Sequence, residues 1–281
     1  MIKLLRANLL RAIKSKTLWI LSIAYAIYAI FLPIVIRGNG VTPELQQGVS
    51  DLLFSTNYGM LGFSLQGIGI AIVCSIVLGA DFHNGTLRNK IILGQTRSNV
   101  YIANLLTTMI ISIAFNVVYM FFFFIVTMPM FGGFVLPATT TLWVFINGSL
   151  MMLAYSSIMT LIVMTSKNST ASVITAFVLL FVGMFLFQYC RSIVSAQEFI
   201  PVNVLDEFGN ITEEIIRNPR YPSPAKKAFF QFVLDFFPSG QSLQISNTEY
   251  THTWQMALYS IGLIGATSGA GILVFKKSNL K

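Results

Sequence analysis

The stretch YIANLLTTMIISIAFNVVYMFFFFIVTM, residues 101–128, contains no Asp, Glu, Lys, Arg or His. A helix needs roughly 20 apolar residues to cross the hydrocarbon core of a bilayer, and this stretch is long enough to do so. Five other stretches of 19 residues or more are equally free of charged side chains: residues 18–36, 58–80, 142–164, 170–190 and 254–275. The sequence therefore predicts an all-α integral membrane protein with six transmembrane helices.

The overall composition agrees with a membrane-embedded chain. Hydrophobic residues make up 55% of it, charged residues only 10%, and the mean hydropathy is +0.73. In a soluble domain about a quarter of the residues are charged. We therefore expect one transmembrane domain over residues 1–281 and no soluble globular domain. The two cysteines, Cys74 and Cys190, lie within or at the end of predicted spans, and their spacing indicates neither a disulfide nor a metal site.

The remaining charges are distributed unevenly across the membrane. If the N-terminus is cytoplasmic, that side receives five basic residues in 1–17, three in 81–100, Lys167 and three in 276–281, but only one acidic residue, Asp81. This positive-inside pattern predicts a protein of the plasma membrane with both termini in the cytoplasm. The net charge of +8 then reflects topology, with anionic lipid rather than nucleic acid as its partner.

The absence of charge within the spans also bears on function. Charged groups inside a membrane usually mark proton relays, ion paths or voltage sensors. None lies in these six spans, so any uphill transport would draw its energy from outside the chain. The pairs Glu213-Glu214 and Ser268-Gly269 are similar to short motifs of intramembrane proteases, but no span supplies the histidine that such chemistry needs.

Three segments outside the spans have sequence patterns that predict where they lie relative to the membrane. Residues 1–17 place apolar and basic side chains on opposite sides of a helix, which predicts an amphipathic N-terminal helix on the inner leaflet; the alternative is a basic flank that only sets topology. Residues 37–57 are predicted to form a polar outside loop. Residues 191–253 are predicted to be an extracellular segment, in which AKKAFFQFVLDFF at 225–237 predicts a helix on the outer leaflet or one packed back on the spans.

The cytoplasmic loop DFHNGTLRNKIILGQTRSNVY, residues 81–101, predicts a short helix parallel to the membrane. The Asn-Gly pair at 84–85 marks a turn. Thr86 would then cap a helix that runs through Leu93 and ends at Gly94. The side chains displayed to the cytosol would be His83, Arg88, Asn89 and Lys90. The pattern alone supports two interpretations: a docking surface for a soluble partner, or a solvated loop whose charges set the topology.

This loop resembles the cytoplasmic signature between the second and third spans of ABC-type exporter permeases of the second membrane family. The matching residues are Asp81, the run Gly85-Thr86-Leu87-Arg88 and the pair Thr96-Arg97. The family usually has Glu at the position of Asp81, and a Lys that is common early in the third span is replaced here by Asn104. The segment Phe237-Pro238-Ser239-Gly240-Gln241 is also similar to the family's stretch ahead of the last span.

The resemblance implies an exporter permease whose coupling helix, in residues 81–100, docks on an ATPase subunit. Bacterial members export antimicrobial peptides, lantibiotics or phenol-soluble modulins. The docking residues would be Phe82, His83, Asn84, Gly85, Thr86, Leu87, Arg88, Asn89, Lys90 and Arg97. The sequence has no G-x-x-x-x-G-K-[ST] phosphate loop, so ATP and Mg would bind to a separate ATPase chain. We therefore expect no catalytic residue, cofactor or metal ligand here, and pairing with a second copy or a homologue.

Polar residues inside apolar spans are candidates for the substrate pathway, because lipid would leave them unpaired. They are Gln66, Asn104, Asn116, Asn147 and Gln188. Hydrogen bonds between helices are the more common use of such residues. Since the spans offer no charged side chain, we expect an amphipathic or hydrophobic substrate, with peptides favoured. Gly265 and Gly269 form a G-x-x-x-G face through which the last span would pack on a neighbouring helix or across a dimer.

Two functions from different classes remain open on these grounds. The first is the transmembrane subunit of an ATP-driven exporter that works by alternating access. The second is a non-transporting immunity or sensory module that binds its ligand through residues 191–253 and needs no ATPase. A secondary carrier ranks third, because the spans offer no residues for proton coupling.

Overall fold

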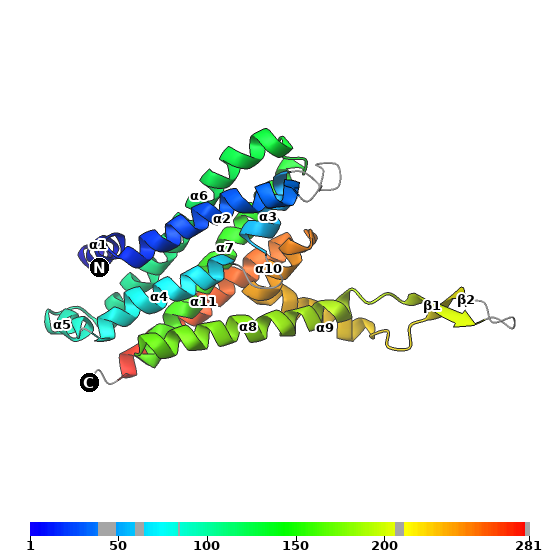
Figure 1. The fold of residues 1–281 in the computed structure, drawn as a ribbon. Coiled ribbons are helices and arrows are strands. Elements are labelled where there is room, and N and C mark those ends of the chain that lie inside the picture. Colours follow the sequence, from blue (N-terminus) through cyan, green and yellow to red (C-terminus); the bar gives the residue numbers. More distant parts are fainter. Residues whose placement is uncertain (39–48, 60–64, 84, 206–210, 279–281) are drawn as a thin grey trace.

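The computed structural model describes residues 1–38, 49–59, 65–83, 85–205 and 211–278 (Figure 1). Most of this length is helical. The helices are α1 (Ile2–Ile13), α2 (Lys16–Gly38), α3 (Val49–Asn57), α4 (Leu65–His83), α5 (Thr86–Ile92), α6 (Arg97–Phe131), α7 (Ala138–Ser166), α8 (Ser169–Val194), α9 (Pro224–Phe236), α10 (Pro238–Ser246) and α11 (Thr253–Lys277). Two strands, β1 (Phe199–Leu205) and β2 (Ile211–Arg217), form an antiparallel hairpin.

Five of the described helices are long and apolar enough to cross a membrane, namely α2, α6, α7, α8 and α11. A sixth crossing is available if α4 and α5 are counted together, with a bend of 60° between Gly67–Phe82 and Thr86–Ile92. The six predicted spans correspond to the five long helices and α4. The prediction of an all-α integral membrane protein is therefore confirmed.

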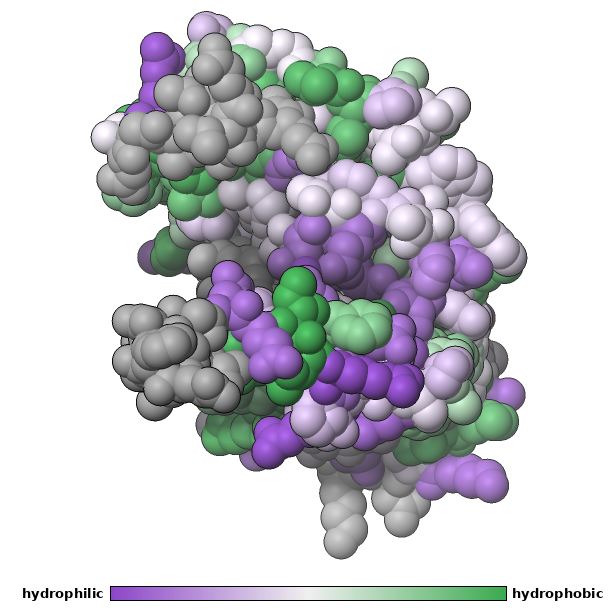
Figure 2. Space-filling model, turned by 90° about the vertical axis from the view of Figure 1, so that its right-hand side faces the viewer, coloured by the Kyte–Doolittle hydropathy of each residue, from purple (hydrophilic) through white to green (hydrophobic). Residues whose placement is uncertain are grey.

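The two ends of the molecule differ. Helix α5 and both chain termini lie at one end of the bundle, and the β1–β2 hairpin projects from the other (Figure 1). Seen from the hairpin end, the surface carries strongly hydrophilic residues directly beside hydrophobic ones (Figure 2). Segments that the sequence predicts on the same side of the membrane thus share one end of the fold.

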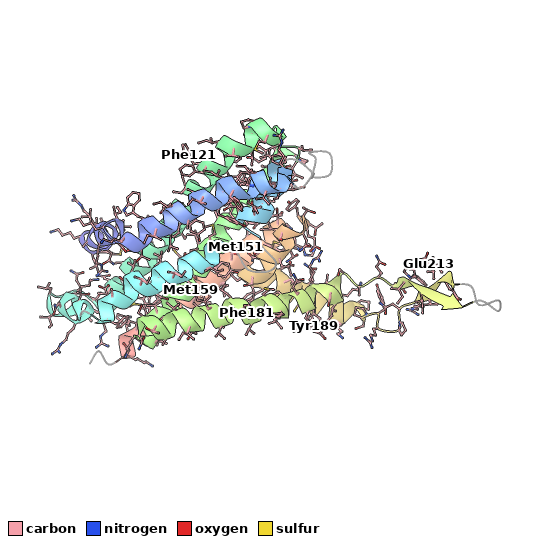
Figure 3. The ribbon with its side chains drawn as sticks, viewed as in Figure 1. Phe121, Met151, Met159, Phe181, Tyr189 and Glu213 are labelled. Atoms are coloured by element: carbon pink, nitrogen blue, oxygen red, sulfur yellow. The ribbon has the colours of Figure 1, made fainter. Side chains whose placement is uncertain are left out.

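Helix α7 is at the centre of the bundle. Its apolar stretch is 61% buried, whereas that of α2 is 17% buried. Met151 and Met159 of α7 lie among the helices, whereas Phe121 and Phe181 point outward (Figure 3). Phe121 is 60% exposed and Met151 is fully buried. The outward side chains of the peripheral helices are those that lipid would cover.

The predicted start of the second span is wrong. This span was expected over residues 58–80, but α4 begins at Leu65. Tyr58 packs against other helices instead: a Cβ atom on Gly148 would lie 2.5 Å from its ring, and Ser242 Oγ donates a hydrogen bond to its carbonyl oxygen at 2.8 Å. Because these contacts hold the chain against α7 and α10 at this point, the membrane-crossing helix starts later.

Two short helices are buried in the bundle. In α3 every residue except Ser55 is buried, and Leu53 and Phe54 are fully so. The predicted polar loop over residues 37–57 is therefore wrong for Val49–Asn57, because these apolar side chains draw the segment into the core; residues 39–48 lie outside the described part. In α10 every residue except the last is buried, although this helix belongs to the segment predicted to be extracellular.

Helix α9 confirms the helix predicted over residues 225–237. Leu234 and Asp235 are buried against the bundle, whereas Phe229 and Phe232 are 61% and 47% exposed. One side of α9 therefore packs back on the spans, and the other offers aromatic side chains to the surroundings.

Candidate functional site

The candidate docking helix α5 is bounded by two glycines. Gly85 and Gly94 have φ angles of 65° and 84°, in the left-handed region that favours glycine. The predicted helix is confirmed over Thr86–Ile92. The predicted capping role of Thr86 is wrong, because Gly85 is the N-cap residue and no side chain caps the helix. The Thr86 hydroxyl donates a hydrogen bond to the Asp81 carboxylate instead.

The outward face of α5 combines polar and apolar side chains. Arg88 and Asn89 are exposed, as predicted. Ile92 and Leu93 are 71% and 80% exposed and belong to the same face. Sequence reasoning missed this apolar pair, although its spacing of four residues from Arg88 and Asn89 is the signal for a shared helix face. We use the term docking face for Arg88, Asn89, Ile92 and Leu93.

The inward face of α5 is fixed by a buried carboxylate. Asp81, at the end of α4, has no exposed side-chain surface and accepts hydrogen bonds from Arg11 of α1 and Thr86 of α5. Lys90 Nζ lies 2.8 Å from Asp81 Oδ2. Lys90 was predicted to be displayed to the cytosol, but its side chain is only 16% exposed, because the buried carboxylate needs cationic partners.

The contacts continue from Lys90 into the bundle. Lys90 Nζ also donates to Asn8 Oδ1 at 3.1 Å, and Asn8 Nδ2 donates to Asn104 Oδ1 at 2.8 Å. The amide of Asn104 in turn lies 3.4 Å from the sulfur of Met164. We call Asp81, Arg11, Lys90, Asn8 and Asn104 the polar network. It joins four helices, α1, α4, α5 and α6, at the end of the bundle that carries the docking face, and Met164 connects it to α7.

The other predicted docking residues have different surroundings. Phe82 packs beside a buried apolar cluster that includes Leu87. Arg97 Nη1 donates to the carbonyl oxygens of Lys276 and Ser278 at 2.8 and 2.6 Å, so it ties the start of α6 to the end of α11. The side chain of His83, and the whole of Asn84, lie outside the described part of the chain.

The predicted pathway residues have different surroundings in the described part of the chain. Asn104 belongs to the polar network, whereas Asn116 accepts a hydrogen bond from Asn57 at 2.8 Å and donates to Tyr58 Oη at 3.3 Å. These two use their amides to hold helices together. Asn147 is 1% exposed, and neither atom of its amide has a hydrogen-bond partner among the described residues. Gln188 is half-buried. The side chain of Gln66 lies outside the described part of the chain.

An apolar cavity of about 260 Å³ lies between α7, α8 and the start of α10. Its walls include Met159, Leu180 and Phe187. In the described lining, the polar side chains are Tyr155 and Ser239, whose Oη and Oγ atoms are joined by a hydrogen bond of 2.8 Å. Such a cavity suits the apolar part of an amphipathic ligand, because apolar surfaces dominate it and the hydroxyls serve to orient.

A sequence model of the family described as "ABC-2 family transporter protein" matches residues 4–183. This match covers more than half of the chain and includes the docking face and the polar network. The chain belongs to the ABC-2 transporter family. None of the curated proteins matches the sequence. The ABC-2 permease is thus a multi-pass transmembrane subunit of an ABC transporter. Such subunits are not themselves catalytic, and the family in general works with an ABC ATPase partner.

Proposed function

We propose that this permease is the transmembrane subunit of an ATP-driven exporter that moves an amphipathic or hydrophobic substrate, with peptides favoured, out of the cell. The observation that carries the proposal is the docking face. At one end of the bundle, the seven-residue helix α5 exposes Arg88, Asn89 and Ile92, and its C-cap residue Leu93 is exposed beside them. Exposed apolar side chains rimmed by polar ones are typical of a protein-binding surface, and an ABC ATPase is the partner that the family supplies.

The polar network supports a mechanical role for α5. A force on the docking face acts on a helix whose inner side is joined by Lys90 and Thr86 to Asp81, and through Asn8 to Asn104. Because these contacts reach α1, α4 and α6, displacement of α5 would move several helices together rather than bend one loop. We propose that ATP binding on two docked ATPases rocks two permease copies between inward-facing and outward-facing states.

We further propose that the α5 end faces the cytoplasm. The basic side chains of Lys3 and Arg6 on α1, and of Lys14 directly after it, are exposed at this end, where anionic headgroups of the inner leaflet would attract them. Both termini would then be cytoplasmic, and ATP and Mg would bind to the partner ATPase.

The proposed substrate class rests on the cavity between α7 and α8. Its apolar walls and single Tyr155–Ser239 hydroxyl pair fit one apolar side of an amphipathic molecule. Among the described residues that line this cavity, none is charged. An amphipathic peptide of the antimicrobial or phenol-soluble-modulin type meets these conditions, with its charged side left toward water or headgroups.

The first experiment is a mild-detergent pull-down of the tagged permease from its native membrane, followed by mass spectrometry. We expect a stoichiometric partner that carries a phosphate loop. Arg88→Glu should release this partner and stop export, while the permease still inserts and dimerises; Gly85→Pro should do the same by disrupting α5. Arg220→Glu is the matched control, because Arg220 is an exposed basic residue beyond the hairpin. Retention of the ATPase and full export by Arg88→Glu would refute docking on α5.

The alternative, a non-transporting immunity or sensory module, draws on the projecting hairpin, which gives residues 191–253 an exposed surface for a ligand. That function would need no docked ATPase. A permease that purifies alone, under conditions in which other membrane complexes stay intact, would favour it.

A further inference from the structure

The β1–β2 hairpin extends away from the helical bundle (Figure 1). It lies beyond residue 183, where the family match ends. An isolated two-stranded hairpin is marginally stable in water, because it has no core of its own. Its side chains are therefore available to a partner.

One face of the hairpin is apolar and open. The register pairs Phe199 with Arg217, Pro201 with Ile215 and Asn203 with Glu213, and paired residues share a face. Phe199 and Ile215 are 57% and 71% exposed, and Pro201 and Glu213 are also exposed. We call Phe199, Pro201, Glu213 and Ile215 the open face; Arg217, the partner of Phe199, is the exposed basic residue at its edge.

The opposite face of the hairpin is more covered. Ile200, Val202 and Ile216 are half-buried there, and Glu214 is its exposed acidic residue. The two adjacent glutamates therefore lie on opposite sides of one strand, and Figure 3 marks the position of Glu213 near the far end of the molecule.

The hairpin segment is strongly acidic in a basic protein. Residues 198–217 hold five of the chain's ten acidic residues and one basic residue, Arg217. Arg217 Nη2 lies 3.2 Å from Glu198 Oε1, so this cation is already used. Glu213 and Glu214 form no ion pair with the described residues. The open face thus combines exposed apolar side chains with an unneutralised carboxylate.

Charge decides which partner suits this surface. A second copy would bring two acidic hairpins together, and anionic lipid would meet the same repulsion. A cationic partner gains attraction, and apolar side chains of its own would cover Phe199 and Ile215. We propose that the open face binds a cationic amphipathic peptide outside the membrane, with apolar side chains on Phe199, Pro201 and Ile215 and a lysine or arginine on Glu213. This site needs no ATPase and is separate from the cavity between α7 and α8.

The binding experiment uses the full chain in nanodiscs of phosphatidylcholine, which carry no net charge. The probe is a fluorescein-labelled 15-residue peptide of alternating Lys and Leu, and its charge-inverted counterpart contains Glu in place of Lys. Fluorescence polarisation against protein-loaded and empty nanodiscs measures binding to the chain itself. We expect saturable binding of the Lys peptide, weaker binding at high salt, and none of the Glu peptide.

Two matched pairs of variants locate the site. Glu213→Gln should weaken binding about threefold, in line with an exposed ion pair, whereas Glu214→Gln on the opposite face should have less effect. Ile215→Ser should weaken binding about tenfold by removing apolar contact, whereas Phe229→Ser on α9 should leave it unchanged. Because the hairpin stands apart from the bundle, size-exclusion profiles of all four variants should match that of the parent.

Three outcomes would overturn the proposal. Equal binding of the Lys and Glu peptides would mean that charge plays no part. Equal losses from Glu213→Gln and Glu214→Gln would mean a diffuse field rather than a site on one face. Disulfide-linked dimers of Ile215→Cys that the Lys peptide does not prevent would make a second copy the occupant. The test is independent of ATPase docking, because Arg88→Glu should leave peptide binding unchanged even where it abolishes export.

Discussion

At the scale of single residues, Asp81 is the buried carboxylate around which the candidate site is organised. Its side chain is 0% exposed and its carboxylate meets Arg11, Lys90 and Thr86. A buried carboxylate persists in its charged form only when cations and donors replace water around it. The acidic residue of the loop signature therefore acts here as the centre of a structural network, and not as a surface charge.

Asp81→Asn should lower the free energy of unfolding by about 2 kcal/mol, less than for a fully buried pair because Arg11 is partly exposed. The positive charges of Arg11 and Lys90 would lose their partner in a confined space. Thermal unfolding in detergent should record a melting temperature lower by about 5 °C, and export should fall with it.

Two control variants distinguish loss of charge from loss of shape. Asp81→Glu keeps the carboxylate and should retain most of the stability. The double variant Asp81→Asn/Lys90→Gln should be more stable than Asp81→Asn alone, because it also removes the unpaired cation. Strict additivity of the two single effects would contradict a direct Asp81–Lys90 interaction.

Asp51 of α3, which is not among the membrane-spanning helices, gives a pH dependence of stability. Its Oδ1 accepts a hydrogen bond from Tyr250 Oη at 2.8 Å, its Oδ2 has no partner among the described residues, and burial raises the pKa of its carboxyl. Because this pKa is higher in the folded chain than in the unfolded chain, stability falls as the pH rises from the unfolded value, about 4, through the folded one.

Asp51→Asn should remove this loss. The variant and the parent should unfold at similar temperatures near pH 4, and the variant should be the more stable at pH 7. Parallel melting curves over that range provide the measurement. A variant that is less stable than its parent at pH 7 would mean that α3 requires the ionised carboxylate.

At the scale of elements, α11 has two different glycine faces. A Cβ atom on Gly271 would lie 1.9 Å from Tyr101 Oη of α6, and Tyr101 is fully buried. Around Gly265 and Gly269 no atom of the described residues lies within 4 Å of such an atom. Gly271 therefore permits close packing of α11 inside the chain, whereas the predicted G-x-x-x-G face is open in the single chain.

Gly271→Leu should destabilise the fold by about 3 kcal/mol, since overpacking forces a rigid buried ring to move. Gly265→Leu on the same helix should leave the melting temperature of detergent-solubilised monomer within about 1 °C. Equal destabilisation by both substitutions would show that helix propensity, and not packing on Tyr101, sets the effect.

At the scale of the whole molecule, the exposed G-x-x-x-G side of α11, at Gly265 and Gly269, is a candidate surface for pairing two copies. Exposed positions along this face include the small residues Gly262, Gly265, Ala266, Gly269 and Ala270. Small side chains let two membrane helices approach closely and gain van der Waals contact that lipid does not match. The exposed face of α8 carries large side chains such as Phe181 and Phe185, which suit contact with lipid.

The double variant Gly265→Leu/Gly269→Leu should shift the permease from dimer to monomer and abolish export, while each chain stays folded. Light scattering on the detergent-solubilised protein and cross-linking in membranes would measure the oligomeric state. Val178→Phe adds bulk to an exposed position on α8 and should leave the dimer intact. An unchanged dimer in the double variant would move the interface to another helix.

The amino-acid sequence by itself determined the fold class and the position of the docking helix. Runs without charge mark the spans, because an ionised side chain is costly in hydrocarbon wherever the rest of the chain lies. Gly85 and Gly94 flank α5 on either side, and both adopt the left-handed conformation that favours glycine. Helical periodicity then places Arg88 and Asn89 outward. Their role in docking stays a prediction, as do the pathway roles of Asn147 and Gln188.

Only the tertiary structure decided which polar residues meet. Asn8 and Asn104 are 96 residues apart in the sequence and share a hydrogen bond of 2.8 Å, while Asp51 and Tyr250 meet across 199 residues. Hydropathy measures the transfer of each side chain into lipid and carries no information about its partner. The sequence therefore predicted α3 as a polar loop and Lys90 as a displayed cation, whereas packing buries the helix and turns the lysine inward to the Asp81 carboxylate.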